Sequence, residues 1–268
     1  MNSVPAYIVF SDLDGTLLDH RTYRYDKALR GISILKKKGI PLVLVSSKTF
    51  PEISALHKEI GLAAPFAFEN GGGIAFPDTA SEVGMRIEIL GAPIEKLRAD
   101  FRLLQGRIPS PAVSILDLPM DDLRKRTGLD ARRIELALQR KASLPFIFTG
   151  SAPSGHEEIG RINSMLHAYG YAITKGGRFY HFIAEHATKG EALRKIVVYY
   201  KTLFQMPAIP TIGIGDSEND IDMFRAVSVP VLVKKFDHTY TDTGMDIRKT
   251  ASIGPEGFSE AIESLIGA

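Results

Sequence analysis

The chain of 268 residues contains no cysteine. This absence excludes disulfide bonds, thiolate catalysis and zinc sites built on cysteine. The sequence also has no apolar run near the ~18 residues that a membrane-spanning helix needs. Residues 1–5 lack the basic segment and apolar stretch of a targeting peptide. We therefore expect a cytoplasmic protein with no membrane partner.

Neither sign of charge is in clear excess. The 33 basic and 31 acidic side chains leave a net charge of +2, which is too balanced to indicate nucleic-acid binding. The strongest basic clusters, residues 36–38 and 132–133, have no aromatic side chains between them and are typical of solvated helix faces or ends. We therefore expect no nucleic-acid partner.

Several common binding motifs are also missing. No phosphate loop of the Gly-Lys-Ser/Thr type occurs. Residues 156–160 lack the second histidine of a zinc protease helix, and residues 213–215 lack the third glycine of a dinucleotide-binding fingerprint. The chemistry of this chain must therefore be sought in other residues.

Both ends of the chain alternate short apolar runs with helical patterns. In the first part, strands are predicted at residues 7–10, 41–45 and 65–68, and helices at 26–38 and 51–60. After Lys189 the pattern resumes with a helix to about residue 204, a strand at 210–214, a helix to 227 and a strand at 229–233. Such successions imply right-handed crossovers and a parallel sheet.

The middle of the chain has a different pattern from about residue 80 onward. Half-exposed strands are predicted at residues 85–90, 146–148, 171–174 and 179–183, and helices at 94–104, 130–139 and 156–169. This part is interpreted as an α+β insert that interrupts the parallel unit.

Two aspartates, Asp12 and Asp14, follow the apolar run at residues 7–10. They should emerge at the carboxyl end of a buried strand, where ligands of open α/β sheets bind, and Gly15 allows a tight turn behind them. Two carboxylates so close together are costly unless a cation, a positive side chain or a chemical task compensates. Taken alone, the pattern also fits a strand followed by an ordinary Asp-Gly turn.

Other polar residues complement this pair. Ser46 follows the second predicted strand, Lys189 begins a helix, and Asp216 follows a later buried strand. Taken singly, the lysine could be solvated and Asp216 could cap a helix. Together, three carboxylates, a lysine and a hydroxyl fit phosphoryl transfer, because oxygen ligands suit Mg²⁺ and the transferring group needs positive charge around it.

Four stretches carry a resemblance to a known family. Residues 12–16 (Asp-Leu-Asp-Gly-Thr), Ser46, Lys189 and residues 215–220 (Gly-Asp-Ser-Glu-Asn-Asp) resemble, in order and spacing, the four motifs of the haloacid dehalogenase-like phosphohydrolases. The insert resembles the large α+β cap of that family. The resemblance implies an α/β fold with a Rossmann-like parallel-sheet core at residues 1–82 and 187–268 and an inserted α+β cap domain at 83–186.

A narrower resemblance is to the mannosyl-3-phosphoglycerate phosphatases. It rests on residues 10–16, 46–49, 69–71, 177–181 and 254–258. The form Ser-Ser-Lys-Thr at 46–49 is informative, because most relatives with this cap have Thr-Gly-Arg there. The resemblance to these phosphatases implies a Mg²⁺-dependent phosphatase that releases mannosylglycerate and phosphate from a phosphorylated sugar-glycerate by way of an aspartyl-phosphate. We expect a monomer or a homodimer.

The sequence leaves alternatives for the substrate and for the reaction. Many of the narrower group carry an acidic, arginine-containing stretch where this chain has residues 149–154 (Thr-Gly-Ser-Ala-Pro-Ser). The substrate could instead be another sugar or polyol phosphate, such as glucosyl-3-phosphoglycerate. The chain could also be a sugar phosphomutase or a non-catalytic binding protein.

The resemblance also assigns roles to single residues. Asp12 would attack phosphorus, and Asp14 would protonate the leaving alkoxide and then deprotonate the hydrolytic water. Ser46 and Lys189 would bind phosphoryl oxygens. Mg²⁺ would be held by Asp12, the backbone carbonyl of Asp14 and Asp216.

Further residues are assigned supporting roles. Asn219 and Asp220 would orient the metal ligands or Lys189. The expected substrate-binding residues are Ser47, Lys48, Asn70, Gly71, Arg178 and His181. The guanidinium of Arg178 suits a substrate carboxylate, whereas His181 could alternatively be a packed, hydrogen-bonded cap residue.

Overall fold

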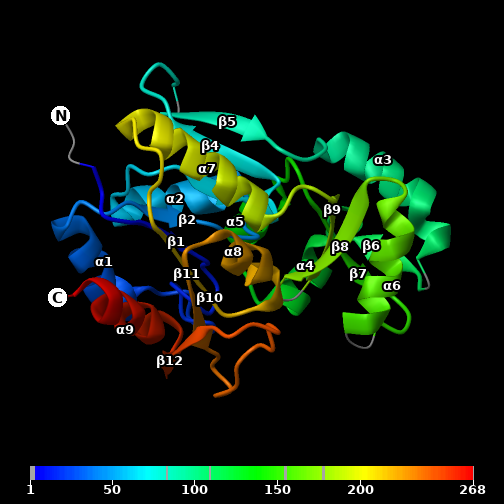
Figure 1. Ribbon diagram of the computed structural model, residues 1–268. Coiled ribbons are helices and arrows are strands. Elements are labelled where there is room, and N and C mark those ends of the chain that lie inside the picture. The colour runs from blue at the N-terminus through cyan, green and yellow to red at the C-terminus, as the bar shows by residue number, and fades with distance from the viewer. Residues whose placement is uncertain (1–3, 83, 109, 154–155, 177–178, 268) are drawn as a thin grey trace.

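The computed structural model describes residues 4–82, 84–108, 110–153, 156–176 and 179–267. Its larger part is built on a five-stranded sheet in the order β12-β11-β10-β1-β2, and every neighbouring pair is parallel (Figure 1). The strands are β1 (Ile8–Ser11), β2 (Leu42–Leu44), β10 (Thr211–Gly215), β11 (Val229–Lys234) and β12 (Arg248–Ile253). Strands from the two ends of the chain therefore lie side by side, and β1 lies between β10 and β2.

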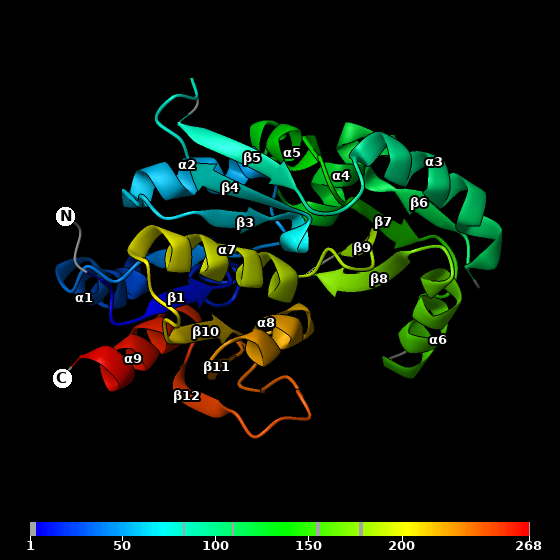
Figure 2. The same ribbon diagram turned by 45° about the horizontal axis from the view of Figure 1, so that its top comes forward.

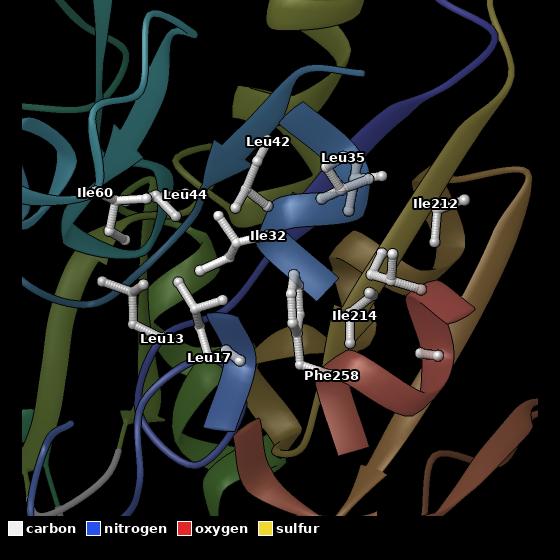
Figure 3. Packing of buried hydrophobic residues seen from close by; sticks show 14 of the residues in the cluster. Leu13, Leu17, Ile32, Leu35, Leu42, Leu44, Ile60, Ile212, Ile214 and Phe258 are labelled. Atoms are coloured by element: carbon white, nitrogen blue, oxygen red, sulfur yellow. The ribbon is translucent and has the colours of Figure 1, made fainter. Parts of the chain in front are cut away.

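Helices cover both faces of this sheet. One face carries α1 (Leu29–Lys37), α2 (Phe50–Ile60) and α9 (Gly254–Ile266), and the other carries α7 (Lys189–Phe204) and α8 (Ile221–Ala226). The alternation of side chains along a strand explains this arrangement. On β1, Val9 packs in the first cluster, with Ile32 and Phe258, whereas Phe10 packs in the second. Figure 3 shows Ile32 and Phe258 within the first cluster. No helix or strand was predicted after residue 233, where β12 and α9 lie.

A second, antiparallel sheet extends the core beside β2. It contains β3 (Phe66–Phe68), β4 (Gly73–Pro77) and β5 (Met85–Ile89), and a parallel bridge between Val45 and Ala67 joins it to the first sheet. β5 pairs with β4 from Gly73 opposite Ile89 to Pro77 opposite Met85. The predicted boundary at residue 83 would put β5 in the cap. We propose instead that the cap begins after β5, and the boundary at 186 stays a prediction.

The insert forms an antiparallel sheet in the order β6-β7-β9-β8, on the opposite side of the molecule from the two termini (Figure 2). Its strands are β6 (Ala112–Ser114), β7 (Leu144–Phe148), β8 (Tyr171–Gly176) and β9 (Phe179–Ala184). α3 (Ile94–Leu104) and α6 (His156–His167) pack on this sheet in a hydrophobic cluster of their own that includes Phe101, Phe146 and Phe182. The predicted fold class, a parallel-sheet α/β core with an inserted α+β cap, is confirmed.

The remaining helices are short. α4 (Met120–Thr127) and α5 (Ala131–Leu138) pack on each other, and single 3₁₀ turns are η1 (Asp26–Ala28), η2 (Glu69–Gly71), η3 (Gln105–Arg107), η4 (Ile115–Asp117) and η5 (Glu218–Asp220). Within the described ranges, none of the helices combines the length and the apolar character that a membrane crossing requires.

Candidate active site

The carboxyl ends of β1 and β10 bring Asp12 and Asp216 together. The backbone N–H of Asp12 donates to the carbonyl of Ile214 at 2.9 Å, and both aspartates are buried. Gly15 turns the chain beneath them with a φ of +87°, and a Cβ at this position would lie 2.6 Å from Oδ2 of Asp216. Glycine is therefore required at position 15 both for its backbone conformation and for the close approach of Asp216.

Lys189 supplies positive charge to the same place from the first turn of α7. Its side chain is 1% exposed, and Nζ donates to Oδ1 of Asp12 at 2.6 Å and to Oδ1 of Asp220 at 2.7 Å. Burial by itself lowers the pKa of a lysine, but the two carboxylates outweigh it and raise the pKa of Lys189 above its usual value. Lys189 therefore stays charged at neutral pH.

The carboxylates outnumber this single cation. Oxygen atoms of Asp12, Asp216 and Asp220 all lie within 4.8 Å of one another. Burial raises the pKa of Asp12 to about 7; the negative charges of Asp220 and Asp14 also raise it, and Lys189 opposes the shift. Burial and the charges of Asp12 and Asp220 likewise raise the pKa of Asp216 well above its usual value. Such a cluster is short of positive charge.

The donor set suits a hard divalent cation. Asp220 is already engaged, because its Oδ2 accepts the backbone N–H groups of Asp216 and Ser217 at 3.0 Å each and its Oδ1 accepts Lys189. Asp12 and Asp216 are then the carboxylates with capacity for a metal, and oxygen ligands are those that Mg²⁺ prefers. The residues at this site therefore fit the Mg²⁺ expected from the sequence, with Asp220 in a supporting position.

Asp14 has a cationic partner of its own. Nζ of Lys48 lies 2.8 Å from Oδ2 of Asp14 and 5.1 Å from the centre of the Tyr23 ring. Burial lowers the pKa of Lys48, but the charges of Asp14 and Glu52 outweigh burial and raise it. Among the described residues, the other carboxylate oxygen of Asp14 has no hydrogen-bond partner. The two aspartates of the opening motif thus sit in different electrostatic surroundings.

Loops after β2 and β3 complete the site. The Oγ of Ser46, which is buried, accepts the backbone N–H of Lys48 at 3.2 Å, and the carbonyl of Ser46 accepts the N–H of Asn70 at 2.9 Å. Oδ1 of Asn70 accepts Nδ2 of Asn219 at 3.1 Å. In the described part of the chain, Nδ2 of Asn70 is buried without a partner. Ser46, Asn70 and Asn219 therefore connect three of the predicted motifs.

Two further residues predicted to bind substrate, Ser47 and Gly71, make their contacts through the backbone. The carbonyl of Ser47 accepts Nη1 of Arg140, a residue of the insert, at 2.7 Å. Gly71 has a φ of +90° and packs so closely on the backbone of Thr188 that a Cβ would lie 2.1 Å from its carbonyl oxygen. Gly71 is thus tied to the start of α7, where Lys189 lies.

Of the two predicted cap residues, only His181 lies in the part of the chain that the structure describes. Arg178 lies outside the described residues. His181 is buried on β9, in register with Pro145 and Thr174. The flanking Tyr180 and Phe182 pack with α3 and α6, so alternation along the strand puts His181 on the other face of the cap sheet.

Three residues at the site had no role assigned from the sequence. The hydroxyl of Thr16 lies 3.4 Å from Oδ1 of Asp216, the hydroxyl of Thr241 donates to the carbonyl of Asp216 at 2.7 Å, and Glu69 is a fully buried carboxylate next to Asn70. Thr16 and Glu69 stand in motifs noted above. Nothing local to Thr241 indicates its contact, because the partner lies in another loop.

Comparisons with known proteins identify the family. A model of the haloacid dehalogenase-like hydrolases matches residues 9–92 and 152–243. A protein of Persephonella marina is 34% identical over 263 residues, 95% of each chain, and one of Methanococcoides burtonii is 34% identical over 272 residues, 97% of each chain. Both are named glucosyl-3-phosphoglycerate/mannosyl-3-phosphoglycerate phosphatase. The chain belongs to the haloacid dehalogenase-like hydrolases.

Membership of the haloacid dehalogenase-like hydrolases confirms the resemblance seen in the sequence and agrees with the predicted class, a phosphoric monoester hydrolase. Solved structures agree on the fold. A Streptococcus mutans protein has a TM-score of 0.70 at 16% identity, covering 98% of this chain and 100% of its own. A subclass IIB sugar phosphatase of the same superfamily has a TM-score of 0.65 at 17% identity, covering 96% and 98%.

Proposed function

We propose that this chain is a Mg²⁺-dependent, cytoplasmic phosphatase that hydrolyses mannosyl-3-phosphoglycerate to mannosylglycerate and phosphate. The main support is the separation of the two aspartates by their partners: Asp12 contacts the buried Lys189, and Asp14 contacts Lys48. Two carboxylates in different surroundings can take different roles in one reaction. The relatives from Persephonella marina and Methanococcoides burtonii, named for such substrates, support the choice of substrate class.

In the first step, a carboxylate oxygen of Asp12 attacks phosphorus and the bond from phosphorus to the glycerate oxygen breaks. Asp14 donates a proton to the departing alkoxide, and an aspartyl-phosphate remains on Asp12. Lys189 holds the attacking carboxylate in place at 2.6 Å and balances negative charge on the phosphoryl oxygens. Nδ2 of Asn70, which has no partner among the described residues, would donate to those oxygens, as would the hydroxyl of Ser46, whose oxygen accepts the N–H of Lys48.

In the second step, Asp14 removes a proton from a water molecule, which attacks the same phosphorus atom. The bond between phosphorus and Asp12 breaks, and phosphate leaves. One residue thus serves first as acid and then as base. A bound Mg²⁺, held by Asp12, Asp216 and the backbone carbonyl of Asp14, would supply the positive charge that the carboxylate cluster lacks.

We expect Lys48 to contact both Asp14 and the substrate. In the structure its ammonium group pairs with Asp14 at 2.8 Å. The glycerate carboxylate or the phosphate of an arriving substrate would attract the same ammonium group, which leaves Asp14 free to handle protons. Arg178 and His181 remain candidate cap contacts for the sugar-glycerate. The glucosyl analogue is the second candidate substrate, because both relatives named above carry both sugars in their names.

The proposal is tested by replacing the nucleophile. Asp12→Asn should lower phosphate release from mannosyl-3-phosphoglycerate by about 10⁴-fold or more, because a neutral amide does not displace the leaving group. Binding of the intact substrate, measured by calorimetry with Mg²⁺ present, should survive. Asp121→Asn, which removes an exposed carboxylate on α4, is the matched control and should turn over normally.

Two outcomes would contradict the proposal. Normal turnover by Asp12→Asn would eliminate Asp12 as the nucleophile. Conversion of a sugar phosphate to its isomer without free phosphate, by the unaltered protein, would instead indicate a phosphomutase.

A further inference from the structure

Glu69 is a buried carboxylate in the turn between β3 and β4, and the reaction described above does not use it. Its side chain is fully buried, and its backbone has a φ of +53°. Oε1 accepts the backbone N–H of Lys141 at 2.8 Å. Oε2 accepts the N–H groups of Ala142 and Ser143 at 3.0 and 2.7 Å and the hydroxyl of Ser143 at 2.8 Å. All four donors belong to residues 141–143, which lie between α5 and β7 of the cap.

The turn that carries Glu69 also touches both chain crossings between core and cap. The carbonyl of Gly72 accepts the N–H groups of Leu90 and Gly91, at 2.8 and 3.3 Å, where the chain leaves β5 for the cap. Where the chain returns, Gly71 lies against the backbone of Thr188. Residues 69–72 are therefore in contact with the outgoing segment, the returning segment and the inner cap segment 141–143.

The same turn is bonded to the phosphoryl-transfer loops. The N–H of Glu69 donates to the carbonyl of Lys48 at 2.8 Å, and the N–H of Asn70 donates to the carbonyl of Ser46 at 2.9 Å. The side chain of Asn70 accepts from Asn219. Two consecutive residues other than glycine, Glu69 and Asn70, have left-handed backbone conformations, which persist where surrounding contacts enforce them.

We propose that Glu69 is a positioning residue, whose carboxylate fastens cap segment 141–143 to turn 69–72 and so sets the place of the cap over the phosphoryl-transfer loops. Displacement of segment 141–143 would leave a buried carboxylate without its donors, which is strongly unfavourable. Motions of the cap should therefore keep this contact and pivot about it. The effect on substrate rests on the proposed function, whereas the fastening itself does not.

The fastening is tested without any substrate. Glu69→Gln replaces one acceptor oxygen with an NH₂ group that faces backbone donors. The amides of residues 141–143 should exchange hydrogen about 10- to 100-fold faster than in the unaltered protein, as expected for the loss of charge-assisted hydrogen bonds, while the amides of β1 and β10 should be unchanged. Glu59→Gln, which removes a carboxylate bonded to Tyr25 on the core surface, is the control. Exchange of residues 141–143 at the original rate would overturn the proposal.

A kinetic comparison distinguishes positioning from general support of the fold. For Glu69→Gln, KM for mannosyl-3-phosphoglycerate should rise about tenfold more than KM for p-nitrophenyl phosphate, which is too small to need the cap. An equal rise in KM for the two substrates would contradict the proposal that Glu69 acts by positioning the cap. If the unaltered protein does not hydrolyse the glycosyl substrate, the proposed function fails while the exchange experiment still decides on the fastening.

Ser143→Ala provides a milder variant should Glu69→Gln not fold. It removes one of the four donors to Glu69 and leaves the carboxylate and the backbone donors in place. Exchange at residues 141–143 should then increase by a smaller factor, again without change in β1. Unchanged exchange in this variant would count against the role of Glu69.

Discussion

Burial governs the behaviour of the carboxylates of Asp12 and Asp216. Both pKa values are raised, first by burial and then by neighbouring negative charge, and Lys189 alone does not cancel the charge of three aspartates. The order and spacing of these residues were visible in the sequence, because short motifs at strand ends indicate a common edge. The contacts of Glu69 and Thr241 were not, because their partners are supplied by loops distant in the sequence.

The raised pKa of Asp12 predicts how Mg²⁺ stabilises the protein. The folded state takes up protons on Asp12 that the unfolded state does not, so this group's contribution to the stability of the metal-free protein is lost as pH rises from about 4 through about 7. Mg²⁺ requires ionised carboxylates, and its binding therefore strengthens over the same range. The rise in Tm caused by Mg²⁺ should be larger at pH 8 than at pH 6.

Thermal unfolding with and without Mg²⁺ at the two pH values measures this effect. Asp12→Asn should reduce both the Mg²⁺-induced shift and its dependence on pH. An equal shift at pH 6 and pH 8 in the unaltered protein would show that Asp12 does not hold the cation.

Among the elements, α2 has a sequence that specifies both of its ends. Thr49 and Glu52 form a capping box at its start, Pro51 lies in its first turn, and Gly61 ends it with a φ of +71°. The predicted helix at residues 51–60 is accordingly confirmed as Phe50–Ile60. α4 was not predicted, because it buries only Leu123 and Thr127 and so has hardly any apolar periodicity.

The cap at Thr49 should contribute measurably to stability. Its hydroxyl lies 2.8 Å from Oε2 of Glu52 and 2.9 Å from the carbonyl of Leu136 in α5, so it is within reach of both the core and the cap. Thr49→Ala should lower the free energy of unfolding by about 1–2 kcal/mol. Urea unfolding measures the loss, and Thr49→Ser, which keeps the hydroxyl, should retain most of the stability. Equal losses in the two variants would rule out the hydroxyl as the cause.

His57, in the last turn of α2, should make stability depend on pH. Burial lowers its pKa, although the hydrogen bond from its Nε2 to the carbonyl of Ala64, at 2.7 Å, opposes the shift. Because the folded state binds this proton less readily, the stability that the neutral histidine provides is present above about pH 6.5 and is lost as pH falls below it.

His57→Gln keeps a donor for Ala64 and removes the titration. The difference in unfolding free energy between the unaltered protein and His57→Gln, measured in saturating Mg²⁺, should shift in favour of the variant from pH 7 to pH 5. A difference that does not change with pH would contradict the assignment.

At the scale of the whole molecule, a parallel-sheet core carries the four motif loops. An inserted sheet, joined to the core by two segments of chain, faces these loops. The sequence predicted this organisation, because apolar runs alternate with helical patterns in both end parts of the chain and not in the middle. In the structure, the core sheet buries a hydrophobic cluster on each face, and the cap has a cluster of its own. The pairing of β5 with β4 was less predictable. Residues 85–89 alternate as a half-exposed strand does, and that pattern does not reveal that the partner is β4 of the core.

The roles of the site residues and the identity of the sugar remain predictions at this scale, because they depend on how core and cap meet around a substrate. Arg178 lies outside the described residues, and the position of His181 places it in the cap sheet without assigning it a ligand. A substrate comparison addresses the core and the cap together.

The most direct test of the central claim is phosphate release from mannosyl-3-phosphoglycerate, glucosyl-3-phosphoglycerate and a simple hexose phosphate, each with Mg²⁺ and with a chelator. We expect kcat/KM to be highest for the mannosyl substrate and much lower for the hexose phosphate, and activity to disappear with the chelator and return on addition of Mg²⁺. Comparable rates on the hexose phosphate, or full activity in the chelator, would contradict the account.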